Sequence, residues 1–151
     1  MAYQFEFRPH HGWGPVALGA SREEVREAMH AAGFPLRSVR RELDYYCTNS
    51  IQVEYTEGRA SFIGVSYSAE YDACYRGRHV FDMPAKELFK LIASGEEAPH
   101  RFDISSYFFP DQVMTLWDAD RQYDRIGGEK RVVWAQVGIG NADYAAFCMA
   151  R

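Results

Sequence analysis

Short stretches of this chain alternate hydrophobic and polar residues, which is the pattern of a half-buried strand. Tyr3, Phe5 and Phe7 alternate in this way and predict a first strand. Three strands are predicted over 43–47, 51–55 and 60–67, three more over 104–109, 113–117 and 132–139, and a closing strand over 143–149.

Hydrophobic residues recur at helical spacing in two places. Ser21 and Glu24 form a Ser-x-x-Glu capping box, and an apolar stripe beginning at Val25 follows it, which predicts a helix over 21–32. Pro84 opens a second predicted helix over 84–94.

The two halves of the chain repeat this order. Glu24 aligns with Glu87 and Val25 with Leu88, in each case 63 positions apart. The repeat predicts two tandem helix-strand-strand-strand units, about 16–67 and 80–140, within a single domain over 1–151. The predicted fold class is α+β, with the two helices packed on one face of an antiparallel sheet.

Composition narrows the classes of protein. With 151 residues, of which 47% are hydrophobic, the chain is typical of a globular domain. A net charge of −4 argues against a nucleic-acid partner, and no apolar run is long enough to span a membrane. The N-terminal pattern predicts a strand rather than a signal peptide, and three widely spaced cysteines suit a reducing compartment, so we expect a cytoplasmic protein.

Motifs of catalysis are missing from the sequence. It has no nucleophile elbow, P-loop, zinc-protease or dinucleotide motif, and His10 and His11 have no third ligand at a recognisable spacing. We therefore expect no catalytic residue, metal or cofactor. Of the three thiols, Cys74 is the one to test for reactivity, because the other two lie in apolar patterns. Four carboxylates in or beside strands are expected to solvate an outer sheet face: Asp44, Glu54, Asp103 and Asp118.

Aromatic residues exceed what one core face needs, which favours a protein interface. Two polar segments, 68–79 and 118–131, interrupt the repeat and read as a connector and an inserted loop, so both can vary without disturbing the core. They supply the candidate partner-binding residues: Tyr71, Asp72, Tyr75, Arg76, Asp118, Asp120, Tyr123, Asp124 and Arg125.

Segments over most of the chain, VALGASREEV (16–25), IQVEY (51–55), FI (62–63) and VFDMPAKEL (80–88), resemble bacterial immunity proteins of polymorphic or contact-dependent toxin systems. The repeat unit also resembles the helix and sheet units of beta-lactamase inhibitor protein and BamE-like lipoproteins, although a lipid-anchor cysteine is missing. No family site residue transfers, because immunity proteins of one fold diverge at their partner surfaces.

The resemblance implies a cytosolic immunity protein that binds a cognate toxin domain and covers its active site. An exposed sheet edge would also allow a homodimer. The alternative is a small enzyme of hydrolase type, or a small-ligand-binding protein, of the same fold.

Overall fold

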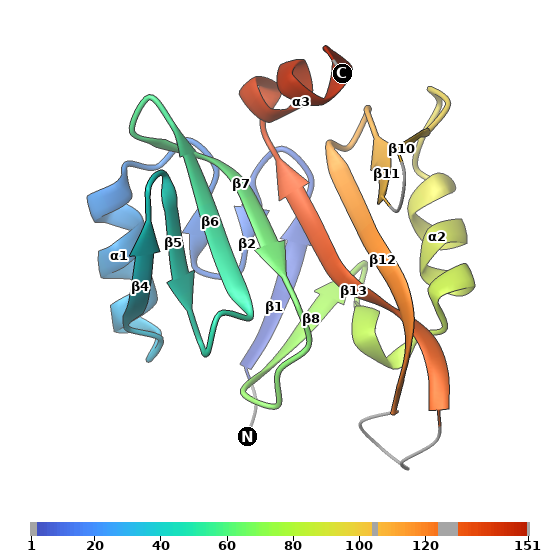
Figure 1. Cartoon of the computed structure of the whole chain (residues 1–151), viewed down its shortest axis with the longest axis horizontal. Coiled ribbons are helices and arrows are strands. Elements are labelled where there is room, and N and C mark those ends of the chain that lie inside the picture. The colour runs from blue at the N-terminus through green and yellow to red at the C-terminus, as the bar shows by residue number, and fades with distance from the viewer. Residues whose placement is uncertain (1–2, 104–105, 124–129, 151) are drawn as a thin grey trace.

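The computed structural model describes residues 3–103, 106–123 and 130–150, which form two sheets and three α-helices (Figure 1). The small sheet has five strands in the order β3-β2-β1-β8-β9. These strands are β1 (Tyr3–Arg8), β2 (Gly12–Trp13), β3 (Val16–Ala17), β8 (Tyr71–Tyr75) and β9 (Arg78–His79).

The large sheet has eight antiparallel strands in the order β10-β11-β12-β13-β7-β6-β5-β4. In chain order they are β4 (Leu36–Arg40), β5 (Leu43–Tyr46), β6 (Ile51–Thr56), β7 (Arg59–Val65), β10 (Arg101–Asp103), β11 (Ser106–Phe109), β12 (Met114–Tyr123) and β13 (Lys130–Gly140). The helices are α1 (Arg22–Ala31), the short 3-10 helix η1 (Val80–Asp82), α2 (Ala85–Ala93) and α3 (Ala142–Met149).

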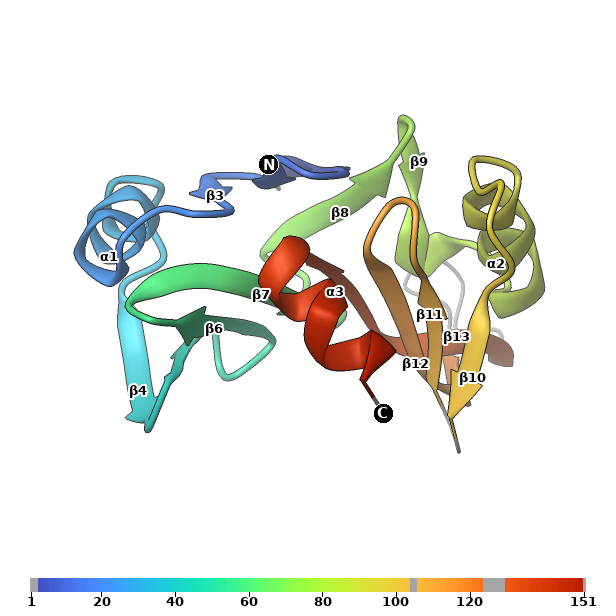
Figure 2. The same cartoon turned by 90° about the horizontal axis from the view of Figure 1, so that it is seen from above.

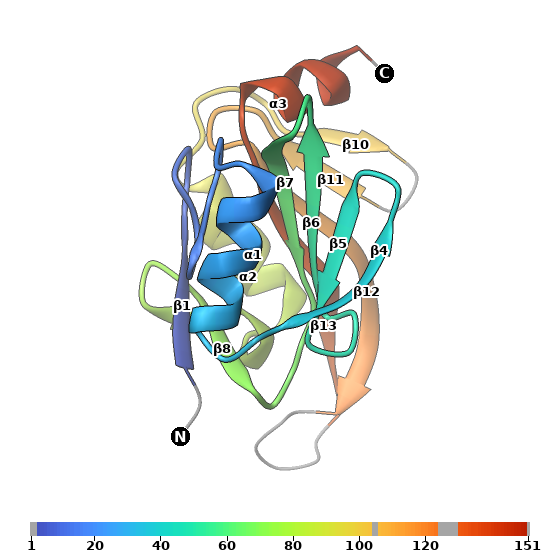
Figure 3. The same ribbon diagram turned by 90° about the vertical axis from the view of Figure 1, so that its left-hand side faces the viewer.

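The predicted fold class is wrong, because a second sheet lies in the layer that was assigned to the two helices alone. Figures 2 and 3 show α1, the small sheet and α2 side by side on one face of the large sheet. The small sheet is held together by β1 and β8, which pair in parallel, for example Phe5 beside Ala73. This pairing joins segments far apart in the chain, so strand periodicity does not reveal it.

The main hydrophobic cluster fills the space between the layers and draws side chains from both sheets and from α1 and α2. Trp13 of the small sheet and Ile63 and Ile139 of the large sheet belong to it, and all three are fully buried. One face of the large sheet is thus covered. The opposite face, here called the outer face, carries the alternate residues of the same strands.

Three pairs of corresponding elements in the two halves, including the helices, start 63 residues apart. α1 begins at Arg22 and α2 at Ala85, while β6 begins at Ile51 and β12 at Met114. Each helix is followed by four strands rather than the three predicted, and the last strands of the two sets, β7 and β13, meet at the middle of the large sheet.

The start of α1 is confirmed in detail. Ser21 accepts a hydrogen bond from the backbone N–H of Glu24, and the Glu24 carboxylate accepts one from the N–H of Ser21. Hydrogen bonds from Ser21 to the carboxylate, that of its backbone N–H first, hold the pKa of Glu24 below its usual value. Gly33, with φ of 91°, adopts the left-handed backbone that ends the helix.

Three sequence-based assignments of segments are corrected. The predicted connector 68–79 contains β8 and β9, and most of the predicted loop 118–131 is strand, because β12 and β13 form a long hairpin that pairs as far as Tyr123 and Lys130. The predicted closing strand 143–149 is α3. Asn141 caps this helix by accepting hydrogen bonds from the N–H groups of Asp143 and Tyr144.

Candidate functional site

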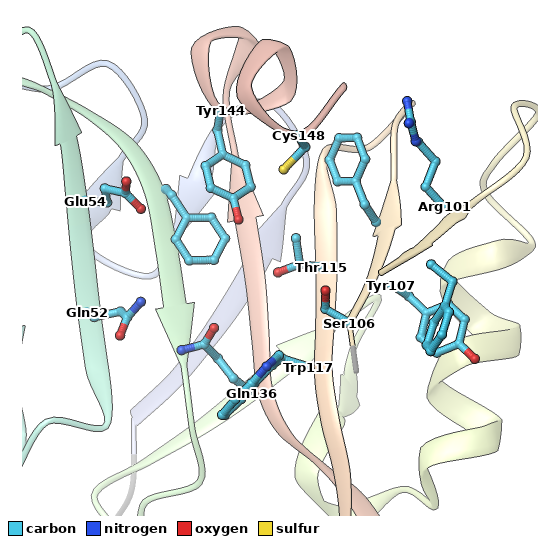
Figure 4. Close-up of a pocket in the computed structure, with 13 residues that line it drawn as sticks. Gln52, Glu54, Arg101, Ser106, Tyr107, Thr115, Trp117, Gln136, Tyr144 and Cys148 are labelled. Carbon is cyan, nitrogen blue, oxygen red and sulfur yellow. The ribbon is translucent and has the colours of Figure 1, made fainter. Parts of the chain in front are cut away.

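A cavity of about 570 Å³ opens on the outer face of the large sheet, beneath α3 (Figure 4). Its walls come from six strands and one helix, so it joins the two halves of the chain. The lining residues are Gln52, Glu54, Phe62, Arg101, Phe102, Ser106, Tyr107, Phe108, Thr115, Trp117, Gln136, Tyr144 and Cys148. Its size is within the range of sites that accept a small molecule or a side chain of a partner.

Two glycines set the depth of the cavity. Gly64 of β7 and Gly138 of β13 are directly opposite each other at the centre of the sheet. A Cβ on Gly138 would lie 2.3 Å from the Phe62 ring, and one on Gly64 would lie 2.7 Å from the Gln136 amide. Because neither glycine has a side chain, Phe62 and Gln136 lie across the strands and the floor stays close to the backbone.

The wall formed by α3 is anchored to the centre of the sheet. The Asn141 N–H donates to the Ser61 carbonyl of β7 at 3.0 Å, which places the start of α3 over that strand. Tyr144 then stacks on Phe62 with ring centroids 4.3 Å apart, and Cys148, one helical turn later, lines the same cavity. A rigid helix therefore closes one end of the pocket.

Glu54 is the acidic group among the described residues that line the cavity. It lies on β6 between Leu43 of β5 and Phe62 of β7, and its side chain is half-buried. Burial raises the pKa of its carboxyl, and no hydrogen bond or ion pair joins the carboxylate to another described residue. In Figure 4 the side chains of Glu54 and Gln52 extend from the same strand toward the hollow, and Gln136 points into it from the floor. The pocket thus holds a desolvated carboxylate with unused acceptor capacity.

Exposed apolar side chains lie at the rim of this pocket and on the helix that closes it. Of the seven large hydrophobic residues that are exposed in the described part of the chain, four lie at its rim or on α3, with exposed fractions between 46% and 60%. They are Phe102, Trp117, Phe147 and Met149. Arg101 joins the two sides of this rim, because its guanidinium lies 3.3 Å from the Met149 sulfur. Large apolar side chains around a polar hollow are typical of a protein-binding surface.

Glu54→Gln is expected to increase the free energy of unfolding at neutral pH. A carboxyl whose pKa is raised in the folded state binds its proton more tightly there, so the wild type loses stability as pH rises through the window above the ordinary glutamate pKa. The neutral amide removes this loss. Urea denaturation of both proteins, at neutral pH and at a pH below the ordinary glutamate pKa, measures their free energies of unfolding. The difference between these free energies should vanish at the lower pH.

The matched control is Glu57→Gln, which changes an exposed carboxylate in the turn between β6 and β7. This variant should unfold like the wild type at both pH values. A Glu54→Gln protein that is less stable than the wild type at neutral pH would contradict the assignment of Glu54 as a desolvated carboxylate without a partner.

The partner-binding residues predicted in segment 68–79 lie on β8 and in the turn after it, away from the pocket. Tyr71 and Tyr75 are 1% exposed, so they belong to the core and are not available to a partner. The Tyr71 hydroxyl donates to the Ser66 carbonyl at 2.6 Å. Asp72 is half-buried and Arg76 is exposed in the β8–β9 turn.

The remaining predicted residues belong to the β12–β13 hairpin. The backbones of Asp118, Asp120 and Tyr123 lie in β12, where Asp120 pairs with Val133 and Tyr123 with Lys130. Asp124 and Arg125 lie outside the described residues. β12 contributes Thr115 and Trp117 to the pocket from its other end, so the predicted surface and the observed pocket share one strand.

Cys74 is the thiol that the sequence singles out, and the structure places it beside a histidine. Its sulfur lies 3.7 Å from Nδ1 of His79, and the same nitrogen lies 3.9 Å from an Asp72 carboxylate oxygen. The thiol is only 3% exposed, which argues for a packing role over nucleophilic chemistry. Cys47, Cys74 and Cys148, all in the described residues, form no disulfide.

The sequence contained a partial signal for the pocket. Glu54 alternates with Val53 and Tyr55 on β6, so its position on the outer face could be predicted from the sequence. The same pattern favoured a Glu54 carboxylate that is exposed to solvent. Its surroundings were not readable, because Phe62, Gln136 and Tyr144 come from three other elements. Asp44 was also expected to be solvated and is instead fully buried.

Within the described residues, no helix is long and apolar enough to cross a membrane, and no three His, Cys, Asp or Glu side chains are placed to hold a metal ion. A scan against protein-family models, a search of curated proteins and a search of solved structures each found no match to this chain.

Proposed function

We propose that this protein is a binding protein whose partner, another protein, docks on the outer face of the large sheet around the pocket beneath α3. The observation that carries the proposal is that the exposed Phe102 and Trp117 line one polar hollow, while Phe147 and Met149 are exposed on α3, the helix that closes it. Exposed aromatic and methionine side chains with a polar centre supply both the buried area and the specificity of a protein interface.

The partner we propose is a bacterial protein toxin domain, so that the protein acts as a cytoplasmic immunity protein that covers the active site of the toxin. The resemblance of segments 16–25 and 80–88 to immunity proteins supports this class of partner. The rigidity of the surface also supports it, because a strand-built floor and a capped helix need little ordering on binding.

Binding is favoured over the enzymatic alternative by the chemistry of the pocket wall. Among the described lining residues, Glu54 is the one carboxyl, and none of them is a histidine, aspartate or lysine that would complete an acid–base pair with it. A raised pKa at a single carboxyl does not by itself make a catalytic site.

The experiment is co-purification of this protein with the C-terminal domain encoded by the adjacent upstream gene, followed by calorimetric titration of variants. Trp117→Ala and Phe147→Ala are each expected to weaken the complex by about 2 kcal/mol or more, the threshold of an interface hot spot. Both side chains are already exposed, so their thermal unfolding should change little.

Tyr3→Ala is the matched control, because Tyr3 is a comparably exposed aromatic residue on the small sheet. Its affinity should equal that of the wild type. A complex that tolerates both Trp117→Ala and Phe147→Ala, or that loses affinity equally in Tyr3→Ala, would place the interface elsewhere and refute the proposed surface.

A further inference from the structure

We propose that the pocket beneath α3 binds the guanidinium group of an arginine side chain that the partner inserts against Glu54. This inference rests on the proposed binding surface and specifies the chemistry at its centre. It starts from a property of Glu54 that folding alone does not explain: a half-buried carboxylate without an ion pair or hydrogen bond to another described residue. Such a group is costly unless a ligand supplies its partner.

Charge complementarity favours a cation. The other polar groups near Glu54 are neutral, namely Gln52 of the same strand, Gln136 of the floor and the Tyr144 hydroxyl above. Arg101 is the basic lining residue, and it stands on the opposite wall in Figure 4, where it contacts Met149. A positive group that enters beside Glu54 therefore meets a carboxylate and amide oxygens first.

The shape and donor pattern favour arginine over lysine. A guanidinium is planar and carries five N–H donors, so it can bind the carboxylate while donating to the Gln52 and Gln136 side chains. Phe62 and Tyr144 stack on each other beside Glu54 and form an aromatic wall on which a flat cation packs well. An ammonium group is compact and strongly hydrated, and it makes less use of a flat aromatic wall.

The test uses small ligands, so it does not depend on the partner. N-acetyl-arginine N-methylamide is titrated into the full chain, and NMR follows the side-chain amides of Gln52 and Gln136. We expect saturable shifts of these signals. The citrulline analogue has nearly the same shape without the charge, and the lysine analogue has the charge without the planar fork; both should bind at least several-fold more weakly.

Glu54→Gln should weaken arginine binding by about tenfold or more, because it removes the carboxylate and keeps the shape of the pocket. Glu57→Gln on the same hairpin should bind arginine like the wild type. The carboxyl of Glu54, followed by its own carbon resonance, should titrate at a lower pH when arginine is bound. The other titratable or charged groups among the described lining residues are Arg101, Tyr107, Tyr144 and Cys148.

The arginine inference would be overturned if the citrulline or lysine analogue bound as tightly as the arginine analogue. It would also be overturned if the arginine analogue caused no saturable shift, or if Glu54→Gln bound it as tightly as the wild type. These outcomes are separable from the failure of the proposed function. If Trp117→Ala weakens the protein partner while arginine does not bind, only the pocket chemistry is wrong. If arginine binds while Trp117→Ala and Phe147→Ala leave the partner unaffected, the pocket stands and the proposed partner surface is wrong.

Discussion

Replacing Asp44 with alanine is expected to lower the free energy of unfolding by about 3 kcal/mol, which is the largest effect expected of any substitution proposed for this protein. Asp44 of β5 is fully buried, and its carboxylate accepts hydrogen bonds from Arg22 at 2.9 Å, from Arg26 at 2.8 Å and from the Tyr55 hydroxyl at 3.1 Å. Both arginines lie on α1. The carboxylate thus joins the helix to the large sheet, and its loss leaves the buried Tyr55 hydroxyl and the partly buried Arg22 guanidinium without this acceptor.

The control for Asp44 is Glu42→Ala. Glu42 also pairs with Arg22, at 3.8 Å, but its side chain is 69% exposed. Its loss should cost less than about 0.5 kcal/mol, because exposed ion pairs contribute little. Urea unfolding of both variants measures the difference, and equal effects of Asp44→Ala and Glu42→Ala would contradict the structural role of the buried carboxylate.

The same cluster predicts an acid dependence of stability. Burial opposes ionisation of Asp44, but the hydrogen bonds from Arg26, Arg22 and Tyr55 outweigh it and hold the pKa of this carboxyl below its ordinary value. The resulting stability is present above the ordinary aspartate pKa and is lost as pH falls through the lowered value. Asp44→Asn should lack this part of the acid transition. The pKa of the nearby Tyr46 hydroxyl is shifted in the opposite direction, because burial and the charge of Asp44 raise this pKa to about 12.

The second large effect is expected at Gln112, in the turn between β11 and β12. Its side-chain oxygen accepts a hydrogen bond from the Tyr75 hydroxyl of the small sheet, and its amide nitrogen donates to the Ile92 carbonyl of α2 at 2.9 Å and to Glu96 at 3.2 Å. Gln112 therefore connects three elements around the end of α2. Gln112→Leu keeps the volume and removes these bonds, and it should cost about 2–3 kcal/mol.

A double-mutant cycle with Tyr75→Phe separates the hydrogen bond from packing. Tyr75→Phe removes the one hydroxyl that Gln112 accepts from and leaves the buried ring in place. If the bond contributes, the double variant should be more stable than the sum of the single losses predicts, by at least about 0.5 kcal/mol. Additive losses would mean that the two residues do not interact energetically.

Local structure was largely readable from the sequence. The capping box at Ser21 and Glu24 marks the first helix because it satisfies backbone N–H groups within four residues, and the alternation in 51–55 marks β6 because side chains of a strand point to opposite faces. The segment 143–149 was misread. The capping side chain of its helix is Asn141, outside the window, and apolar residues such as Ala145 and Ala146 suit either element.

Tertiary packing determined which strands pair and where α3 lies, neither of which the alternation of hydrophobic and polar residues predicts. The sequence determined by itself where the two larger helices and most strands lie, because those signals act over a few residues. Only the tertiary structure paired β1 with β8, which buried Tyr71 and Tyr75, and set α3 over β7, which built a pocket around Glu54. These contacts join residues far apart in the chain, and no local pattern encodes the free energy of bringing such segments together.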